Sequence, residues 1–310
     1  MNTTVRFTDF WKSSNSTQEN FFIPLVELIY EEDVTVVQDP SIKVDLEFFS
    51  VFKKNTPIQK RISSRFQKKV AGKSQQSESY TVRNARKSIW FTGENKRPPL
   101  SQGFDSYLGF EPDGFIKNVH YLPLWVLNLD NFGRGSAHGF TSAKTSQEIL
   151  TSPRESKTFN EGETKFCCAF ISNPLSFRLG LIKELNEIET VDIFGKVVNR
   201  TIHDKVSVAQ NYRFGIAFEN SIYPGYVTEK LLEAYTSGTI PVYWGNDSES
   251  YFNPNSFINL HDFKSFEEFK LELQAINNDP TKYQRMFCQP LLNRPFDLES
   301  LMLRIRSDLF

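Results

Sequence analysis

The feature that most constrains this fold is a regular alternation of short apolar runs with helix-like segments in the second half of the chain. Four segments have a strand pattern: residues 166–171, 191–194, 214–218 and 240–244. Between them lie segments with apolar residues at helical spacing, such as Leu181 and Leu185. Strands that alternate with helices pair in parallel, because the chain crosses back over the sheet through each helix. The sequence therefore predicts an α/β fold with a parallel sheet.

The length of 310 residues exceeds what one compact core usually holds, so we expect two domains. The first half shows further strand patterns at residues 5–11, 46–52, 88–91, 107–110 and 121–127. We place an N-terminal domain at residues 1–155 and a C-terminal domain at 156–310. Residues 133–163 are rich in Gly, Ser, Thr, Lys and Glu and are predicted to form a loop and linker. The last helix, at 298–309, is a candidate to cross back to the first domain.

Composition narrows the classes of function. The chain is 39% hydrophobic and 24% charged, which is typical of a folded protein. Its formal net charge of -1 argues against nucleic acid as a partner, so any attraction to phosphate must come from local charge. The three cysteines include the adjacent pair Cys167 and Cys168, which we interpret as core residues of a strand rather than a disulfide framework.

The N-terminus lacks a basic segment followed by an apolar one, and no apolar run is long enough to span a bilayer. We therefore expect a cytoplasmic protein. Residues 53–73 hold eight basic residues and no acidic one, mostly on the polar face of a predicted helix at 57–71. This face could contact anionic lipid and attach the protein peripherally to membrane. We favour a solvated helix face, because its apolar stripe is narrow.

The chemistry is concentrated where the strand ending at Phe218 is followed by Glu219, Asn220, a turn with Gly225, and a helix that starts near Thr228. In open α/β sheets, ligands bind at the carboxyl ends of strands. The N–H groups and the positive dipole end of the following helix favour phosphate at the same place. The sequence therefore predicts a phosphate-containing ligand here.

Lys230 strengthens that prediction. A cation in the first turn of a helix opposes the helix dipole, at a cost of up to about 1 kcal/mol, and a bound diphosphate would reverse the sign. The neighbouring Glu229 could accept hydrogen bonds from ribose hydroxyls. The alternative is that Glu229 and Lys230 are solvated surface residues. We favour the binding role because strand end, turn and helix start coincide.

Residues 218–246, FENSIYPGYVTEKLLEAYTSGTIPVYWGN, closely resemble the signature of the α-1,3/1,4-fucosyltransferase family. The resemblance extends over about residues 88 to 265. It includes four flanking motifs: residues 91–95 (FTGEN), 170–174 (FISNP) followed by Arg178, 191–195 (VDIFG) and 257–263 (FINLHDF). It implies a GT-B-type fold, with two Rossmann-like domains facing across a cleft. It also implies GDP-β-L-fucose as donor and inversion at the anomeric carbon.

By motif position, the resemblance implies that Arg178 and Lys230 hold the diphosphate and that Glu229 holds the ribose. Asn220 and Tyr226 would line the donor site. Arginine and lysine can stabilise a departing diphosphate without a metal. A metal-using transferase would offer clustered carboxylates, and the nearest stretch, residues 128–130, has only one. We therefore expect no metal and no cofactor.

Two carboxylates remain as catalytic candidates. The family resemblance makes Glu94 the general base, while its residues alone would equally fit a loop carboxylate that accepts nearby N–H groups. Glu219 would contact fucose or stabilise developing positive charge, or it would be a buried carboxylate bonded to the loop backbone. For Glu219 both interpretations stay open.

The sequence as a whole predicts an inverting α-1,3-fucosyltransferase that uses GDP-fucose and an N-acetyllactosamine-type oligosaccharide or glycolipid acceptor. One alternative is a GT-B transferase with another donor, acceptor or linkage. The other is a sugar-nucleotide-binding protein without catalysis. Glu94, Arg178 and Lys230 argue against the last alternative, because the set of charged groups is complete.

Overall fold

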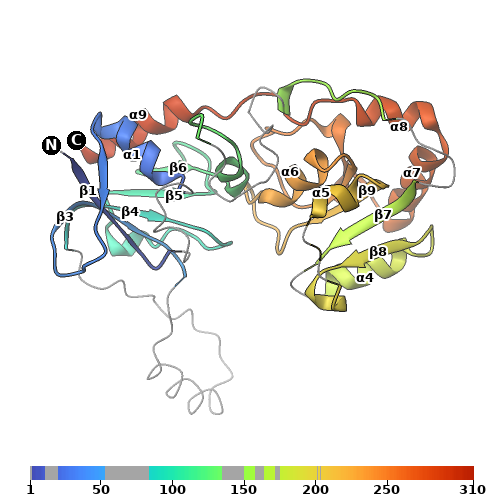
Figure 1. The fold of residues 1–310 in the computed structure, drawn as a ribbon, viewed down its shortest axis with the longest axis horizontal. Helices are drawn as coiled ribbons and strands as arrows, with labels where there is room; N and C mark the ends of the chain where they lie inside the picture. Colours follow the sequence, from blue (N-terminus) through green and yellow to red (C-terminus); the bar gives the residue numbers. More distant parts are fainter. Residues whose placement is uncertain are drawn as a thin grey trace, which may run out of the picture. The chain divides into compact units, whose positions relative to one another are not determined.

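The computed structural model describes residues 2–10, 20–52, 84–134, 150–157, 164–171, 175–200, 202 and 204–310. Its contacts divide the chain into two compact units (Figure 1). The first comprises residues 1–122 and 298–310, and the second comprises residues 123–297. We had placed the boundary at residue 155. The difference arises at Trp125, whose ring packs against Tyr251 and Phe252 of the second unit and brings the chain into that core soon after residue 122.

The first unit is built on a six-stranded sheet in the order β2-β1-β3-β4-β5-β6. Every pairing in this sheet is parallel. Its strands are β1 (Thr3–Thr8), β2 (Val34–Val36), β3 (Val44–Phe49), β4 (Ala85–Phe91), β5 (Ser106–Gly109) and β6 (Val119–Tyr121). Two helices, α1 (Phe22–Tyr30) and α9 (Leu298–Leu309), contact each other in this unit, and the Tyr30 ring packs edge-on against Phe310.

The second unit is built on a five-stranded sheet in the order β11-β10-β9-β7-β8, again parallel throughout. Its strands are β7 (Lys165–Phe170), β8 (Val191–Phe194), β9 (Tyr212–Phe218), β10 (Ile240–Trp244) and β11 (Ile258–Asn259). Its helices are α4 (Ser176–Leu185), α5 (Lys205–Ala209), α6 (Glu229–Thr236), α7 (Phe266–Asn278) and α8 (Pro280–Phe287). The chain runs from β7 outward to β8 and then returns to β9 on the other side of β7. The direction of strand addition therefore reverses between β7 and β9.

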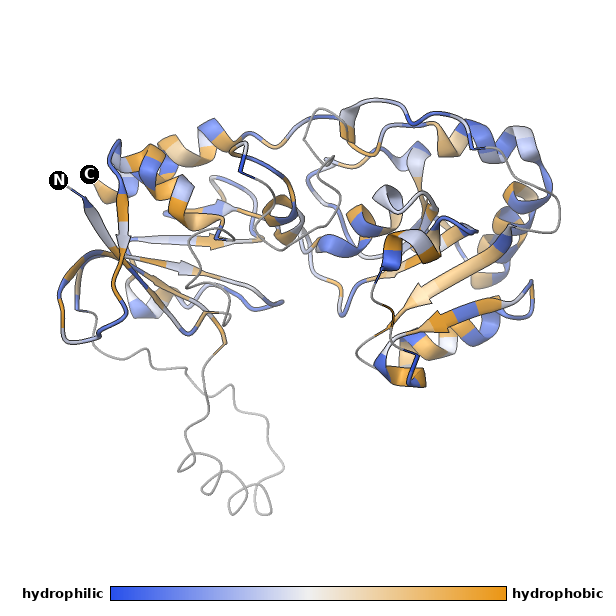
Figure 2. Cartoon of the chain, in the orientation of Figure 1, coloured by the Kyte–Doolittle hydropathy of each residue, from blue (hydrophilic) through white to orange (hydrophobic). Residues whose placement is uncertain are grey.

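Helices cover both faces of the second sheet. One apolar cluster joins the strands to α4, α7 and α8, with Leu185, Leu273 and Phe287 among its buried residues. A smaller cluster packs Ala209 of α5 against Cys168. In Figure 2 the strands of this unit are largely apolar, whereas the surrounding helices alternate apolar and polar residues. A sheet covered on both faces needs apolar strands, so the predicted parallel α/β fold is confirmed.

The core expectations hold in detail. Cys167 and Cys168 are both buried, with free thiols. On α9, the predicted apolar face is buried through Leu301, Ile305 and Leu309. These residues recur at helical spacing, which is why the pattern could be recognised from the sequence.

One predicted strand is wrong. Residues 121–127 do not form a strand, because β6 ends at Tyr121 and a 3₁₀ helix, η3, spans Leu124–Asn128. Pro123 has no N–H to donate to a neighbouring strand, and the Val126 N–H donates instead to the Pro123 carbonyl. A short apolar run does not by itself distinguish a strand from a buried helical turn.

Other predictions fall on residues that the structure does not describe. The basic segment 53–73 with its predicted helix lies outside the described residues, and so does most of the predicted loop and linker at 133–163. In the part of the chain that is described, no helix combines the length and the apolar character needed to cross a bilayer.

Candidate active site

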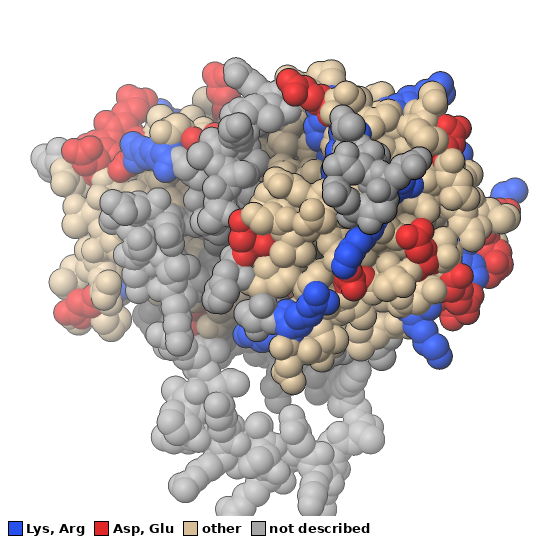
Figure 3. All heavy atoms as spheres, turned by 45° about the vertical axis from the view of Figure 1, so that its right-hand side comes forward, with Lys and Arg blue, Asp and Glu red and all other residues tan. Residues whose placement is uncertain are grey.

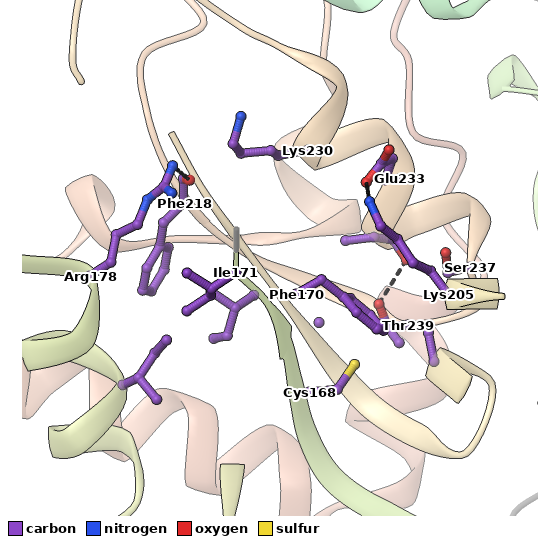
Figure 4. Close-up of a pocket in the computed structure, with 15 residues that line it drawn as sticks. Cys168, Phe170, Ile171, Arg178, Lys205, Phe218, Lys230, Glu233, Ser237 and Thr239 are labelled. Atoms are coloured by element: carbon purple, nitrogen blue, oxygen red, sulfur yellow. Dashed lines mark hydrogen bonds and ion pairs between the residues drawn. The ribbon is translucent and has the colours of Figure 1, made fainter. Parts of the chain in front are cut away.

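The candidate site lies where strand addition reverses in the second sheet, at the carboxyl ends of β7 and β9. In open α/β sheets this position is the usual ligand site, because the loops that follow the two strands part to opposite faces. A pocket opens there (Figure 4), and polar or charged groups enter it from α4, α5 and α6. It is lined by Cys168, Phe170, Ile171, Arg178, Ile182, Lys205, Ala209, Gly215, Ile216, Phe218, Lys230, Glu233, Ala234, Ser237 and Thr239.

Glu219 is the first residue after β9, and its side chain is completely buried. Its N–H donates to the Trp244 carbonyl at 2.9 Å, which extends the pairing of β9 with β10 by one residue. The backbone of Gly245 passes so close that an added Cβ would lie 2.9 Å from the Glu219 Cγ and 2.1 Å from the Tyr243 hydroxyl oxygen. A glycine at position 245 is therefore what leaves room for the Glu219 side chain.

Both carboxylate oxygens of Glu219 are engaged at the start of α6. Oε1 accepts the Thr228 N–H at 2.8 Å, and Oε2 accepts the Thr228 hydroxyl at 2.8 Å. The ammonium of Lys230 lies 3.4 Å from Oε2. Both oxygens are thus occupied and shielded from solvent, as the buried, backbone-bonded interpretation of Glu219 expects, and the catalytic role stays a prediction.

Lys230 is held at the first turn of α6. Its ammonium donates to the Thr228 hydroxyl oxygen at 2.9 Å and to Glu229 Oε1 at 3.1 Å. Thr228 is the N-cap residue of α6, yet its side chain makes no capping hydrogen bond, because the hydroxyl is occupied by Glu219 and Lys230. The positive end of α6 and the Lys230 ammonium therefore lie together at the pocket.

Arg178 brings a second cation to the pocket from α4. Its side chain is buried, with Nε donating to the Glu219 carbonyl at 3.3 Å and Nη2 donating to the Phe218 carbonyl at 2.7 Å. Nη2 also donates to the Asn220 side-chain oxygen. The Nε and Nη2 edge of the guanidinium is thus held at the end of β9. No described residue accepts a hydrogen bond from Nη1, which therefore remains a donor for a ligand.

Burial and charge act against each other in this cluster. Burial raises the pKa of the Glu219 carboxyl, although the neighbouring Lys230 opposes this. Burial lowers the pKa of the Arg178 guanidinium, against the attraction of Glu219. Burial also acts to lower the pKa of Lys230, but Glu219 and Glu229 outweigh it and raise the value. The ammonium is therefore stabilised in its charged form before any ligand arrives.

The structure brings together five of the seven residues selected from the sequence: Arg178, Glu219, Asn220, Glu229 and Lys230. Asn220 does not line the pocket, but its side-chain oxygen accepts a hydrogen bond from Arg178 and so orients that residue. Glu229 begins α6, and its partly exposed carboxylate pairs with Lys230. Burial acts to raise its pKa, but Lys230 and hydrogen bonds bring the value below the ordinary one.

Of the other two residues, Glu94 lies in the first unit, whereas Tyr226 lies near Arg178 and acts to raise the pKa of its guanidinium. Tyr226 is buried under the turn before α6, and its side chain is not part of the pocket lining. Glu94 belongs to the first unit, in an exposed loop that follows β4. The backbone of this loop is organised by hydrogen bonds to the Glu94 carbonyl from the Thr92 hydroxyl and from the Lys96 N–H. The roles proposed for Glu94 and Tyr226 remain predictions.

Sequence reasoning missed Lys205, Glu233 and the bridging role of Thr228. Glu233 lies four residues after Glu229 and so occupies the same face of α6, a spacing that could have drawn notice. Lys205 pairs with it at 3.1 Å, but across 28 positions of the sequence. No local pattern links residues so far apart.

Over the face of the second unit shown in Figure 3, acidic and basic side chains are interspersed. The pocket cations are therefore a local feature rather than part of a broad basic surface, consistent with the net charge. Within the described ranges, no three His, Cys, Asp or Glu side chains gather in a metal-binding arrangement.

Comparison with known proteins finds a family model that resembles part of this chain. Residues 160–289 match the model described as "Glycosyltransferase family 10 (fucosyltransferase) C-term". The chain is 31% identical over 228 residues to the alpha-(1,3)-fucosyltransferase FucT of Helicobacter pylori, covering 67% of this chain and 48% of that protein. It is 29% identical over 157 residues to 4-galactosyl-N-acetylglucosaminide 3-alpha-L-fucosyltransferase 9 of Rattus norvegicus, covering 48% of this chain and 42% of that one. The chain thus spans about half the length of these relatives.

Solved structures agree with the fold. A crystal structure of an α1,3-fucosyltransferase matches with a TM-score of 0.70 at 23% identity, over 99% of this chain and 90% of that one. The structure described as an α1,3-fucosyltransferase with GDP-fucose matches with a TM-score of 0.66 at 22% identity, over the same shares. The family resemblance and the GT-B-like α/β fold class are confirmed.

Proposed function

We propose that this chain, whose residues 160–289 match the model of glycosyltransferase family 10, transfers L-fucose from GDP-β-L-fucose to an acceptor hydroxyl with inversion and without a metal. The observation that carries the proposal is the pair of fixed cations, Arg178 and Lys230, beside the start of α6 at the β7/β9 edge. A pocket with two cations and a helix N-terminus favours a diphosphate. The proposal draws further support from relatives named as α-1,3-fucosyltransferases and from a structural neighbour described with GDP-fucose.

The reaction needs stabilisation of the leaving group. As the bond between the fucose anomeric carbon and the β-phosphate oxygen breaks, negative charge grows on GDP. Arg178 can donate from Nη1, and the Lys230 ammonium, which donates to Thr228 and Glu229, has a third N–H for the phosphate. Such prepositioned donors contribute more to the transition state than mobile ones, because their orientation is already fixed before the bond breaks. Two fixed cations supply the positive charge that a metal would otherwise provide.

Inversion requires an acceptor hydroxyl to attack from the opposite face and to lose its proton. In the proposed mechanism the acceptor oxygen bonds to the anomeric carbon, GDP leaves, and the hydroxyl proton passes to Glu94. An exposed carboxylate at the carboxyl end of a strand is accessible to an acceptor. General-base assistance of this kind contributes about 10²–10⁴-fold to rate.

The acceptor proposal follows the names of relatives. The rat protein is called a 4-galactosyl-N-acetylglucosaminide 3-alpha-L-fucosyltransferase, which describes transfer to N-acetyllactosamine through an α-1,3 linkage. We propose the same acceptor class and linkage here, on a free oligosaccharide or a glycolipid.

Acceptor-dependent release of GDP from GDP-fucose, measured with EDTA present, tests the proposal. The acceptor panel is lactose, N-acetyllactosamine and the isomer with 1,3-linked galactose. We expect release with N-acetyllactosamine and a product with an α-1,3 linkage by NMR. Activity that disappears in EDTA and returns with Mg²⁺ or Mn²⁺ would refute metal independence. GDP-fucose binding without release on any acceptor would favour a binding protein.

A further inference from the structure

A second charged pair, Lys205 and Glu233, enters the same pocket and is not used by the chemistry above. Lys205 lies on α5 and Glu233 on α6, and the Lys205 ammonium lies 3.1 Å from Glu233 Oε2. Figure 4 shows this pair on the α5 side of the pocket, apart from Arg178. The pair therefore extends the polar surface of the pocket beyond the two cations assigned to the diphosphate.

The pair keeps hydrogen-bonding capacity for a ligand. Glu233 uses Oε2 for Lys205, and no described residue donates to its Oε1. Lys205 uses one of its three N–H donors for Glu233. Burial raises the pKa of the Glu233 carboxyl, against the attraction of Lys205. A ligand that donates N–H groups to this carboxylate would favour its charged form.

The spacing of Glu229 and Glu233 on α6 suits the ribose and the base of a nucleoside diphosphate. Glu233 lies one turn after Glu229 on the same helix face, and three residues after Lys230. With the diphosphate at Lys230 and the ribose at Glu229, the base extends toward Glu233 and Lys205. Apolar side chains that include Phe170 and Ile216 line the same pocket, as a flat heteroaromatic ring requires.

We propose that Glu233 and Lys205 select guanine as the base of the donor, an inference that rests on the nucleoside diphosphate donor proposed above. Guanine carries N–H donors at N1 and at its 2-amino group, and an acceptor at O6. The Glu233 carboxylate accepts from the two donors, and the Lys205 ammonium donates to O6. Adenine lacks O6 and presents an amino group there, so it would face Lys205 with a donor. A site built for particular hydrogen bonds rejects analogues that lack them.

Binding of three nucleotides separates the two contacts. GDP and inosine diphosphate share O6, but inosine diphosphate lacks the 2-amino group, and ADP lacks both. For the wild-type protein with EDTA present, calorimetry should show that GDP binds about tenfold more tightly than inosine diphosphate. ADP should bind more weakly than either. Each variant is then compared through ratios of affinities, which cancel general losses of binding.

The two variants have different expected signatures. Glu233→Gln should weaken GDP binding about tenfold and reduce the preference for GDP over inosine diphosphate to within about twofold. Lys205→Met should weaken GDP and inosine diphosphate about equally and should not weaken ADP. Lys205 is about half exposed, at 52%, so its replacement should not disturb folding.

The matched control is the ion pair between Lys282 and Glu272, which joins α8 to α7 at 2.8 Å with side chains 38% and 37% exposed. Neither residue lines the pocket. Glu272→Gln and Lys282→Met should leave all three affinities unchanged. A Glu233→Gln protein that keeps the full preference for GDP over inosine diphosphate would overturn the assignment while the donor class stands. Absence of GDP binding by the wild-type protein would instead refute the proposed function.

Discussion

Two carboxylates follow parallel strands in the two units, and their surroundings differ completely. Glu219, after β9, has no exposed surface, and both of its oxygens accept hydrogen bonds from Thr228. Glu94, after β4, is exposed in a loop. A buried carboxylate with both oxygens occupied holds other groups in place, whereas an exposed one can exchange protons with a ligand. We therefore propose that the same residue type at the same kind of strand end serves positioning in one unit and catalysis in the other.

The difference follows from where each strand lies in its sheet. Strand β9 borders the point of reversal in the second sheet, so the residue after it meets α4 and α6 from opposite faces. In the first sheet the reversal lies between β1 and β3, and β4 is one strand removed from it. Glu94 therefore follows a strand away from that point, and its side chain is exposed.

The largest effect that the comparison predicts is on turnover. Glu94→Gln should lower the rate of fucose transfer by about 10²–10⁴-fold while GDP-fucose affinity stays within about twofold, because the general base is lost and the donor site is not. Steady-state rates and calorimetric affinities measure the two quantities. The control is Glu32→Gln, because Glu32 lies in the same unit and is also exposed. Near-normal turnover in Glu94→Gln would remove it from catalysis.

The next effect concerns Glu219 and is on stability. Glu219→Gln should lower the free energy of unfolding by about 2 kcal/mol at neutral pH, because the amide sets an NH₂ group against the Thr228 hydroxyl or Lys230. Urea denaturation measures the loss, with the exposed Glu184→Gln on α4 as control. The pH dependence of kcat/KM should keep its shape. A changed pH profile with unchanged stability would make Glu219 a proton-transfer residue and reverse the comparison.

Lys230 links the positioning carboxylate to the ligand. Lys230→Met should weaken GDP binding by about 10–100-fold, since charged hydrogen bonds to the diphosphate are lost. Lys183→Met on α4, an exposed lysine, should bind GDP as the wild-type protein does. Unchanged GDP affinity in Lys230→Met would show that the lysine serves only to neutralise Glu219.

Asp247, in the loop after β10, is intermediate in burial between Glu219 and Glu94. Its Oδ2 accepts the Phe252 N–H at 2.9 Å, whereas its Oδ1 is buried without a hydrogen-bond partner among the described residues. Burial raises its pKa from 3.8 to about 6. A raised pKa means that its contribution to stability is full below pH 3.8 and is lost as pH rises to about 6.

The Asp247→Asn variant isolates that contribution. Between pH 3.8 and 6.5, the stability of the wild-type protein relative to Asp247→Asn should fall by about 1–2 kcal/mol, after allowance for partial exposure. Denaturation curves of both proteins at several pH values measure the difference, in which all shared groups cancel. A pH-independent difference would contradict the raised pKa.

The sequence predicted those parts of the fold whose signals are local. The strands at 191–194 and 240–244 were placed correctly because glycines precede or follow the apolar runs, at positions 195 and 238. Both glycines have positive φ, which other residues rarely adopt. The misassigned strand at 121–127 shows the limit, since a short apolar run there forms η3.

The site was predicted in part for the same reason. Glu229 and Lys230 are recognisable beside a strand end and a turn, and Arg178 entered through the family resemblance. The pairing of Arg178 with Asn220, and the pairing of Lys205 with Glu233, depend on the order of strands in the sheet. A single sequence does not give that order, so the contacts that distinguish positioning from catalysis appeared only in the structure.

The most direct test of the central claim, that Arg178 and Lys230 hold a diphosphate without a metal, compares GDP with GMP by calorimetry in the presence of EDTA. Wild-type protein should bind GDP at least about tenfold more tightly than GMP, because the second phosphate contacts the two cations. Equal affinities for GDP and GMP, or GDP binding that requires a divalent metal, would contradict it.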